Sequence, residues 1–271
     1  MIFYKTVCSG NDFIHIDLEE TDLSRDQQKS ELARVICNRN SGAGADGVVY
    51  YRIQKKSADF QIFNQDGTRA ELSGNGMAGL ASVLFQLNHF RDGIILNTGV
   101  GKKAVELIER MGNKFKLRIE IGKPNFQQAE FFPFLESNRL EYRYQDIDFV
   151  PVSVGNPHAV VLLSEFFSDH KLQAMAKELA SAPIFPQGTN VELVCQDAER
   201  PLQIFYYERG VGRTLFSSTG SAAVFAVMQR LKKIHDSLSL PTPSGNIKIS
   251  GIRKICLENF CEIVYKGIYW K

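Results

Sequence analysis

Apolar and polar positions alternate along this chain in two distinct patterns. Short runs rich in β-branched and aromatic residues, broken by Gly, Asn and Pro, are typical of strands. We predict strands over residues 60–63, 94–96, 116–120, 159–162 and 203–207. Two further segments, residues 77–87 and 221–228, are small or apolar on almost every side. Such a pattern predicts a helix that is buried all round.

The chain also resembles itself at a shift of about 144 residues. Paired positions at this shift include Gly44 and Gly188, Asn64 and Glu208, Ser73 and Ser217, and Gly101 and Gly245. This period is too long for a solenoid repeat. We therefore expect an α+β fold of two pseudo-symmetric lobes, residues 1–140 and 141–271, each a β-sheet wrapped around one central helix.

Both predicted helices begin with a cluster of small polar residues, 73–76 and 217–220. A helix start offers unpaired N–H groups and a positive partial charge, which suit a carboxylate. Ser73 and Ser217 are equally suited to capping their own helices. One such end in each lobe predicts a single ligand site where the lobes meet.

The residues before these helices supply polar groups at matching positions. Asn64 and Glu208 each lie nine residues before the serine that starts the next helix. Arg209 can bind a carboxylate through two hydrogen bonds, and Glu208 can accept from an ammonium group. Further neutral amides come from Asn11, Asn156 and Asn190. This set suits a zwitterionic amino acid with a second polar end, although turn formation explains any single Asn before Gly or Pro.

Composition narrows the class of protein. The 32 basic and 30 acidic residues leave a formal charge of +2, which argues against nucleic acid as a partner. No apolar stretch is long enough to span a membrane, and the first residues lack the layout of a signal peptide. The five cysteines are scattered without a CxxC motif, so we expect neither a metal site nor a disulfide framework. These features predict a cytoplasmic protein.

Eight motifs together are specific for one family. They are residues 9–13, 44–47, 63–67, 71–76, 154–160, 189–191, 207–212 and 219–220. In this order they resemble the diaminopimelate epimerase family of the proline-racemase-like superfamily. The resemblance implies two pseudo-symmetric lobes with the ligand between them. It also implies a cofactor-independent isomerase that converts LL- to meso-diaminopimelate, in lysine and peptidoglycan precursor synthesis, by two-base proton transfer at the α-carbon.

The resemblance also assigns roles to residues. The non-reacting end of the substrate would be held by Asn11, Asn64, Asn156, Asn190 and Arg209. The reacting centre would be surrounded by Gly74, Asn75, Glu208, Ser218 and Thr219. The family uses two cysteines, one at each helix start, to remove and deliver the proton on opposite faces of the α-carbon. Those catalytic positions are Ser73 and Ser217 in this chain.

The two serines are the main departure from the family pattern. Cysteine has a pKa of about 8.5, whereas water, the nearest reference for an alcohol, has about 15.7. The difference of about seven pK units costs about 9–10 kcal/mol, of which a helix start returns about 1–2 kcal/mol. Serine alone is therefore a very poor base. His158, Asp66 and Cys8 are candidates to assist, although each equally suits a structural role.

Three functions remain open at this stage. The first is a diaminopimelate epimerase-like isomerase whose activity is impaired by the serines. The second is a catalytically inactive homologue that binds an amino acid. The third is a superfamily member with a different reaction, since a hydroxyproline dehydratase and a phenazine-pathway isomerase both work without the full cysteine pair. Ala78, where Arg is common, and Ser218, where Gly is usual, favour natural divergence. A homodimer is compatible with each of these functions.

Overall fold

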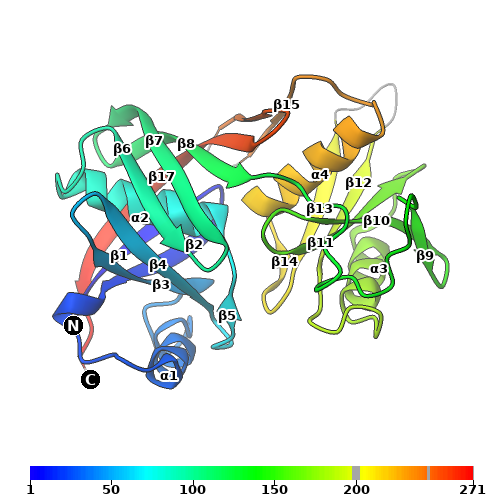
Figure 1. Cartoon of the computed structure of the whole chain (residues 1–271). Helices are drawn as coiled ribbons and strands as arrows, with labels where there is room; N and C mark the ends of the chain where they lie inside the picture. The colour runs from blue at the N-terminus through cyan, green and yellow to red at the C-terminus, as the bar shows by residue number, and fades with distance from the viewer. Residues whose placement is uncertain (197–201, 243–244, 271) are drawn as a thin grey trace.

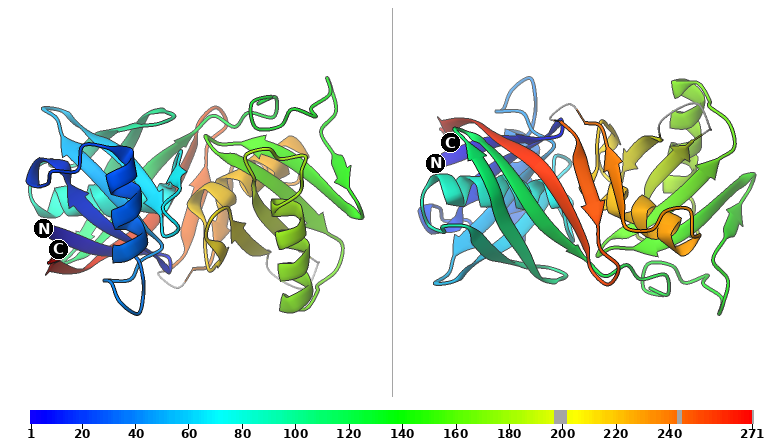
Figure 2. Two further views of the ribbon diagram at one scale, coloured as in Figure 1. Left: turned by 90° about the horizontal axis from the view of Figure 1, so that it is seen from below. Right: turned by 90° about the horizontal axis from the view of Figure 1, so that it is seen from above.

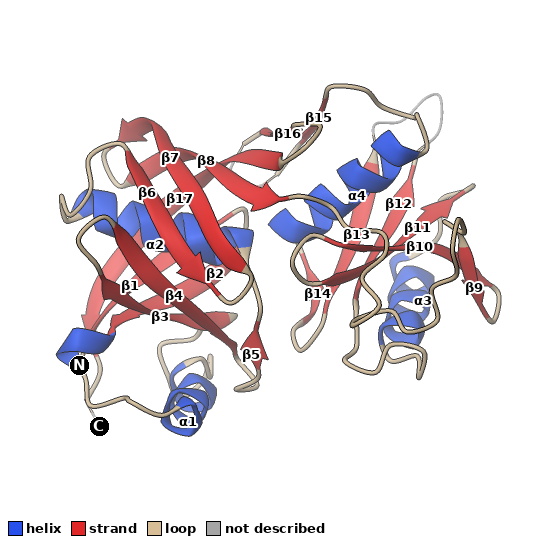
Figure 3. Ribbon diagram, viewed as in Figure 1, coloured by secondary structure: helices blue, strands red, loops and turns tan. Residues whose placement is uncertain are grey.

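The computed structural model describes residues 1–196, 202–242 and 245–270, and it contains two β-sheets with four α-helices in these ranges (Figure 1). One sheet dominates the half of the molecule that holds both termini, and the other dominates the opposite half (Figure 3). This arrangement confirms the predicted α+β class with two lobes.

The first sheet closes into a barrel. Its eight closing strands follow the order β1 (Ile2–Cys8), β2 (Asn11–Asp17), β3 (Gly47–Ile53), β4 (Ser57–Asn64), β6 (Gly93–Thr98), β7 (Gly101–Met111), β8 (Lys114–Gly122) and β17 (Ile255–Ile268). Because β1 pairs with both β2 and β17, the circle is complete. The short β5 (Arg69–Ala70) pairs with β4, and η1 (Leu18–Glu20) and α1 (Asp26–Ile36) pack against the barrel wall.

Helix α2 (Gly74–Gln86) lies inside this barrel (Figure 1). All of its residues from Gly74 to Phe85 are buried, as expected for a helix that is apolar on every side. Gly79 permits this packing, since a Cβ there would lie 2.5 Å from Thr6 Oγ1 and 2.6 Å from His15 Nε2. The helix is therefore fitted closely to the strands around it.

The second sheet is open and carries a helix on each face. Its order is β14 (Gly212–Thr214), β13 (Gln203–Glu208), β12 (Asn190–Cys195), β11 (Pro157–Leu163), β10 (Ile147–Ser153) and β9 (Tyr142–Tyr144). Neighbouring residues alternate between faces: Val160 and Val194 share a core with α4 (Ser218–Arg230), whereas Val161 and Leu193 share one with α3 (Asp169–Ala180).

The first sheet continues past the barrel and reaches the second lobe. Strands β16 (Ile247–Ser250) and β15 (Ser237–Leu240) extend it from β17, and α4 packs against β16 and β17 (Figure 2). Helix α4 is therefore enclosed by the second sheet on one side and by the first on the other. The predicted division at residues 140 and 141 stays a prediction, but the pairing of β17 joins the end of the chain to the first lobe.

The predicted elements agree with the structure. The five predicted strands lie within β4, β6, β8, β11 and β13, and the two predicted helices are α2 and α4. Both helices begin three residues earlier than expected, directly after the capping serine. The internal duplication stays a prediction, although α2 and α4 have the same length of 13 residues. No helix in the described ranges has the length and apolar character that crossing a membrane requires.

Candidate active site between the lobes

The starts of α2 and α4 meet at the centre of the molecule. Ser73 Oγ accepts a hydrogen bond from the Gly76 N–H at 3.1 Å, and Ser217 Oγ accepts one from the Gly220 N–H at 3.2 Å. A Cβ on Gly74 would overlap the Cβ of Ser218. The two serines therefore lie on adjoining helix ends, where the sequence predicts a shared site.

A cavity of about 480 Å³, its mouth included, lies beside these helix ends. Seven residues singled out in the sequence line it: Asn11, Asn64, Ser73, Asn156, Asn190, Glu208 and Arg209. The other five stand at the helix starts behind this wall: Gly74, Asn75, Ser217, Ser218 and Thr219. Asp46 and Glu71 also line the cavity, although the sequence motifs predicted a role for neither.

Glu208 is hydrogen-bonded to the serine that starts α4. Its Oε2 accepts a hydrogen bond from Ser217 Oγ at 3.2 Å, and Oε1 is shut off from solvent. Burial raises the pKa of Glu208 to about 7, although the hydroxyl groups of Thr214 and Ser217 oppose the shift. This carboxyl group can therefore both accept and release a proton near neutral pH.

The other candidate assistants form hydrogen bonds with groups other than the two serines. His158 is fully buried, with Nδ1 2.9 Å from Glu192 Oε1 and Nε2 2.9 Å from Asn156 Oδ1. Asp66 accepts from the Thr68 N–H and shapes a turn. Cys8 is buried, and burial raises the pKa of its thiol. Among the residues that the structure describes, no carboxylate or imidazole hydrogen-bonds to Ser73.

The asparagine side chains are fixed in orientation by their neighbours. Asn11 Nδ2 donates to Asp46 Oδ2 at 2.5 Å, and Asn11 Oδ1 accepts from Asn75 Nδ2 at 3.3 Å. Asn190 Nδ2 donates to the Pro157 carbonyl at 2.8 Å. These contacts place amide groups around the cavity before any ligand arrives, which lowers the cost of ordering them.

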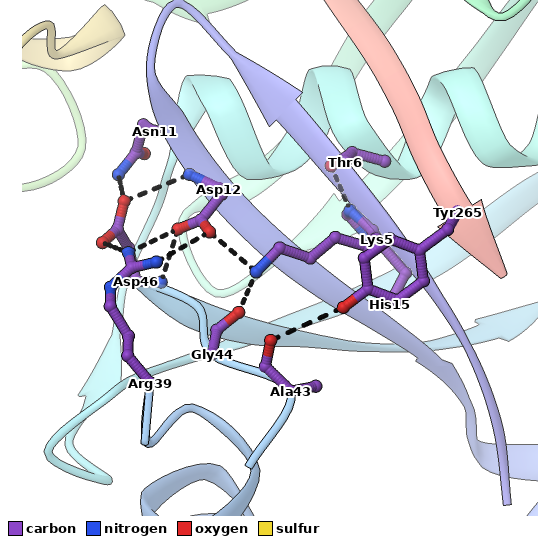
Figure 4. Close-up of polar contacts among 10 residues, drawn as sticks. All are labelled: Lys5, Thr6, Asn11, Asp12, His15, Arg39, Ala43, Gly44, Asp46 and Tyr265. Atoms are coloured by element: carbon purple, nitrogen blue, oxygen red, sulfur yellow. Dashed lines mark hydrogen bonds and ion pairs between the residues drawn. The ribbon is translucent and has the colours of Figure 1, made fainter. Parts of the chain in front are cut away.

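A network of charges supports Asn11 from behind (Figure 4). Arg39 Nη2 forms an ion pair with Asp46 Oδ1 at 2.8 Å and a second one with Asp12 Oδ1 at 2.9 Å. Lys5, which is buried, lies 2.7 Å from Asp12 Oδ2. Arg39, outside the cavity, thus balances the charge of Asp46. The other carboxylate oxygen of Asp46 accepts the hydrogen bond that orients Asn11.

An ion pair crosses the cavity from one lobe to the other. Arg209 follows β13 in the second lobe, and its Nη2 is bonded to Oε2 of Glu71, which follows β5 in the first lobe. Nη1 of Arg209 donates to the Gln187 carbonyl at 2.9 Å, and its backbone N–H donates to Asn190 Oδ1 at 3.0 Å. The guanidinium is therefore held at both of its ends.

Comparison with known proteins identifies the family. The diaminopimelate epimerase family model matches residues 3–126 and 150–254. The chain belongs to the diaminopimelate epimerase family. The diaminopimelate epimerase of Methanothrix thermoacetophila is 31% identical over 270 residues, which cover 98% of this chain and 95% of that protein. That of Carboxydothermus hydrogenoformans is 30% identical and both chains are covered completely.

Solved structures share the fold of this diaminopimelate epimerase family member. A hydroxyproline epimerase from Agrobacterium vitis, with bound trans-4-hydroxy-L-proline, has a TM-score of 0.73 at 14% identity and covers 98% of this chain and 90% of its own. A phenazine biosynthesis protein from Bacillus anthracis has a TM-score of 0.66 at 12% identity, with 98% of each chain covered. The family match itself makes the chain an amino-acid isomerase.

Proposed function

We propose that this protein binds diaminopimelate, or an amino acid very like it, between its lobes and exchanges the α-proton of that ligand. One observation supports this above the others: Glu208, with a pKa raised to about 7, is hydrogen-bonded to Ser217 at the helix start. In the family a cysteine thiol occupies the position of Ser217. The buried carboxylate supplies a base that serine alone lacks.

The chemistry follows from the helix ends. The N–H groups of the first turns of α2 and α4 suit the α-carboxylate of the ligand and the negative charge that develops on it when the α-proton leaves. Glu208 takes that proton, directly or through the Ser217 hydroxyl, on one face of the α-carbon. Ser73 faces the other side with no ionisable partner among the described residues. Inversion of the centre is therefore slower than exchange with solvent.

The test is incubation with LL-diaminopimelate in deuterated water. We expect deuterium at the α-carbon, formed faster than the meso isomer, and loss of exchange in Glu208→Gln. Ser73→Cys restores a thiol on the face that lacks one, so this variant speeds inversion more than Ser217→Cys does. The double cysteine variant gains orders of magnitude in both rates. Absence of exchange in the wild type at high enzyme concentration overturns the proposal.

A second candidate function is binding without catalysis. The replacement of both thiols, while Asn11, Asn64, Asn156, Asn190 and Arg209 still stand around the cavity, favours it. Calorimetry distinguishes the two functions. Binding of diaminopimelate without any α-deuterium in the wild type supports the non-catalytic function, and exchange excludes it.

A further inference from the structure

The charged groups on the cavity wall differ in how they are balanced. Asp46, Glu71, Glu208 and Arg209 all line it. Asp46 is neutralised by Arg39, whose guanidinium lies 2.8 Å away and outside the cavity wall. Glu208 belongs to the reacting end through its bond to Ser217. At the other end there remains one cation and one anion, the ion pair of Arg209 and Glu71.

This ion pair is accessible to a ligand. The side chains of Glu71 and Arg209 are 27% and 23% exposed, so neither is sealed within the core. Each has capacity to spare, because a carboxylate accepts several hydrogen bonds and a guanidinium donates five. Around the pair, the asparagine amides carry no net charge. The subsite as a whole is therefore electrically neutral but strongly polarised.

We propose that Glu71 is a specificity-determining residue that makes this end of the cavity select a zwitterionic group. The inference rests on the proposed function, since it concerns the non-reacting end of the same ligand. An ammonium and a carboxylate on one carbon match Glu71 and Arg209 respectively. A lone carboxylate is attracted by Arg209 but repelled by Glu71. A lone ammonium is attracted by Glu71 but repelled by Arg209. Selection therefore works by repulsion as well as by attraction.

The contacts of Arg209 favour a direct role for Glu71. The guanidinium is already positioned by the Gln187 carbonyl at 2.9 Å, and the backbone by Asn190. Glu71 is the one carboxylate in the described part of the chain that pairs with Arg209. Loss of its charge leaves Arg209 in place but turns the neutral subsite into a positive one.

The experiment is calorimetry with three ligands that differ only at the non-reacting end. Diaminopimelate carries both charges there, 2-aminopimelate carries the carboxylate alone, and lysine carries the ammonium alone. We expect the wild type to prefer diaminopimelate to either analogue. In Glu71→Gln, the preference for diaminopimelate over 2-aminopimelate falls at least about tenfold, which corresponds to about 1.4 kcal/mol, while lysine binding weakens further.

Two further variants serve as controls. Glu71→Asp keeps the charge and retains the wild-type order of the three ligands. Glu130→Gln removes a charge from the neighbouring interlobe cavity, which Glu71 also lines; the Glu130 carboxylate contacts Gln128 at 3.5 Å rather than Arg209. This control keeps the wild-type preference. Because each comparison is made within one variant, partial unfolding does not alter it.

The outcomes separate this inference from the proposed function. If the wild type binds diaminopimelate and Glu71→Gln keeps the same preference, the role of Glu71 is wrong and the proposed function stands. A purely structural role gives that same result, because it weakens all three ligands together. An equal shift in Glu130→Gln also overturns the inference. If the wild type binds none of the three ligands, both the proposed function and the inference fall.

Discussion

Serine at the two helix starts preserves one property of the site and changes another. Ser73 and Ser217 cap α2 and α4 through their Oγ atoms, a role in which serine is among the best residues. Neither hydroxyl has the acidity of a thiol. Proton transfer near neutral pH therefore depends on a neighbouring group, and Glu208 is placed to provide it.

The raised pKa of Glu208 predicts a specific pH dependence of stability. Its pKa is about 7 in the folded protein, against an ordinary value of 4.5, so the folded state holds the proton more tightly than the unfolded state. The cost of ionising this buried group is absent below about pH 4.5 and grows as the pH rises to about 7, to at most about 3 kcal/mol. Glu208→Gln removes the cost.

Urea unfolding of both proteins at about pH 5 and about pH 8 measures this effect as a difference in unfolding free energy. From about pH 5 to about pH 8 the unfolding free energy of the wild type falls relative to that of Glu208→Gln, because only the wild type must ionise the buried carboxyl group. Equal pH dependence in the two proteins contradicts a buried, proton-holding Glu208. The comparison cancels the other titrating groups, since the two chains differ at one position.

At the level of residues, the sequence predicted which residues line the cavity better than it predicted which of them form hydrogen bonds and ion pairs with one another. Seven predicted residues stand on its wall, because their motifs belong to a known family pattern. Asp46 and Glu71 lie in the same motifs but received no role, since their partners Asn11 and Arg209 are distant in sequence. His158 shows the converse, because its buried bond to Glu192 depends on the parallel pairing of β11 and β12.

At the level of elements, the helices that matter were also the easiest to predict. Helices α2 and α4 are apolar all round, and this pattern reflects their burial between strands. Helices α1 and α3 lie on the outside and bury residues on one side only; they are more polar than α2 and α4, and neither was predicted. Barrel closure could not be predicted either, because β1 and β17 lie at opposite ends of the chain.

The close fit of α2 in the barrel predicts the effect of one added methyl group. Gly79→Ala places a Cβ 2.5 Å from Thr6 Oγ1 and 2.6 Å from His15 Nε2, both on buried barrel strands. Overpacking of this kind costs about 1–3 kcal/mol, more than the gain of up to about 1 kcal/mol from replacing glycine in a helix.

Thermal or urea unfolding checks this prediction, with Gly93→Ala as the control. The nearest atom to a Cβ on Gly93 is the Val105 carbonyl oxygen at 3.8 Å, an ordinary contact. We expect a clear loss of stability in Gly79→Ala and little change in the control. A Gly79→Ala protein as stable as the wild type would mean that Thr6 and His15 can shift to make room for the added methyl group.

At the level of the whole molecule, the last strand unites the two lobes. Strand β17 pairs with β1 and β8 to close the barrel, and it carries β16, which packs on α4. Buried residues of both central helices therefore belong to one continuous core. The sequence pattern gave no sign of this shared core, because the pairing of β17 with β1 joins residues at opposite ends of the chain.

A truncation tests the importance of β17. Removal of residues 255–271 opens the barrel along both neighbours of β17, so we expect the amides of α2 to exchange rapidly with solvent. Removal of residues 270–271 alone is the control, since Trp270 is 83% exposed. Slow exchange throughout α2 in the longer truncation would show that seven strands suffice to enclose the helix.

The closure of the barrel by its final strand has a consequence for biosynthesis. During translation, the first seven strands and their apolar helix emerge from the ribosome well before residues 255–268. Until then the nascent chain exposes the unpaired edges of β1 and β8 and leaves the apolar helix α2 incompletely covered. Both features promote aggregation. We expect chaperones to hold the growing polypeptide until residues 255–268 have been made and can close the barrel.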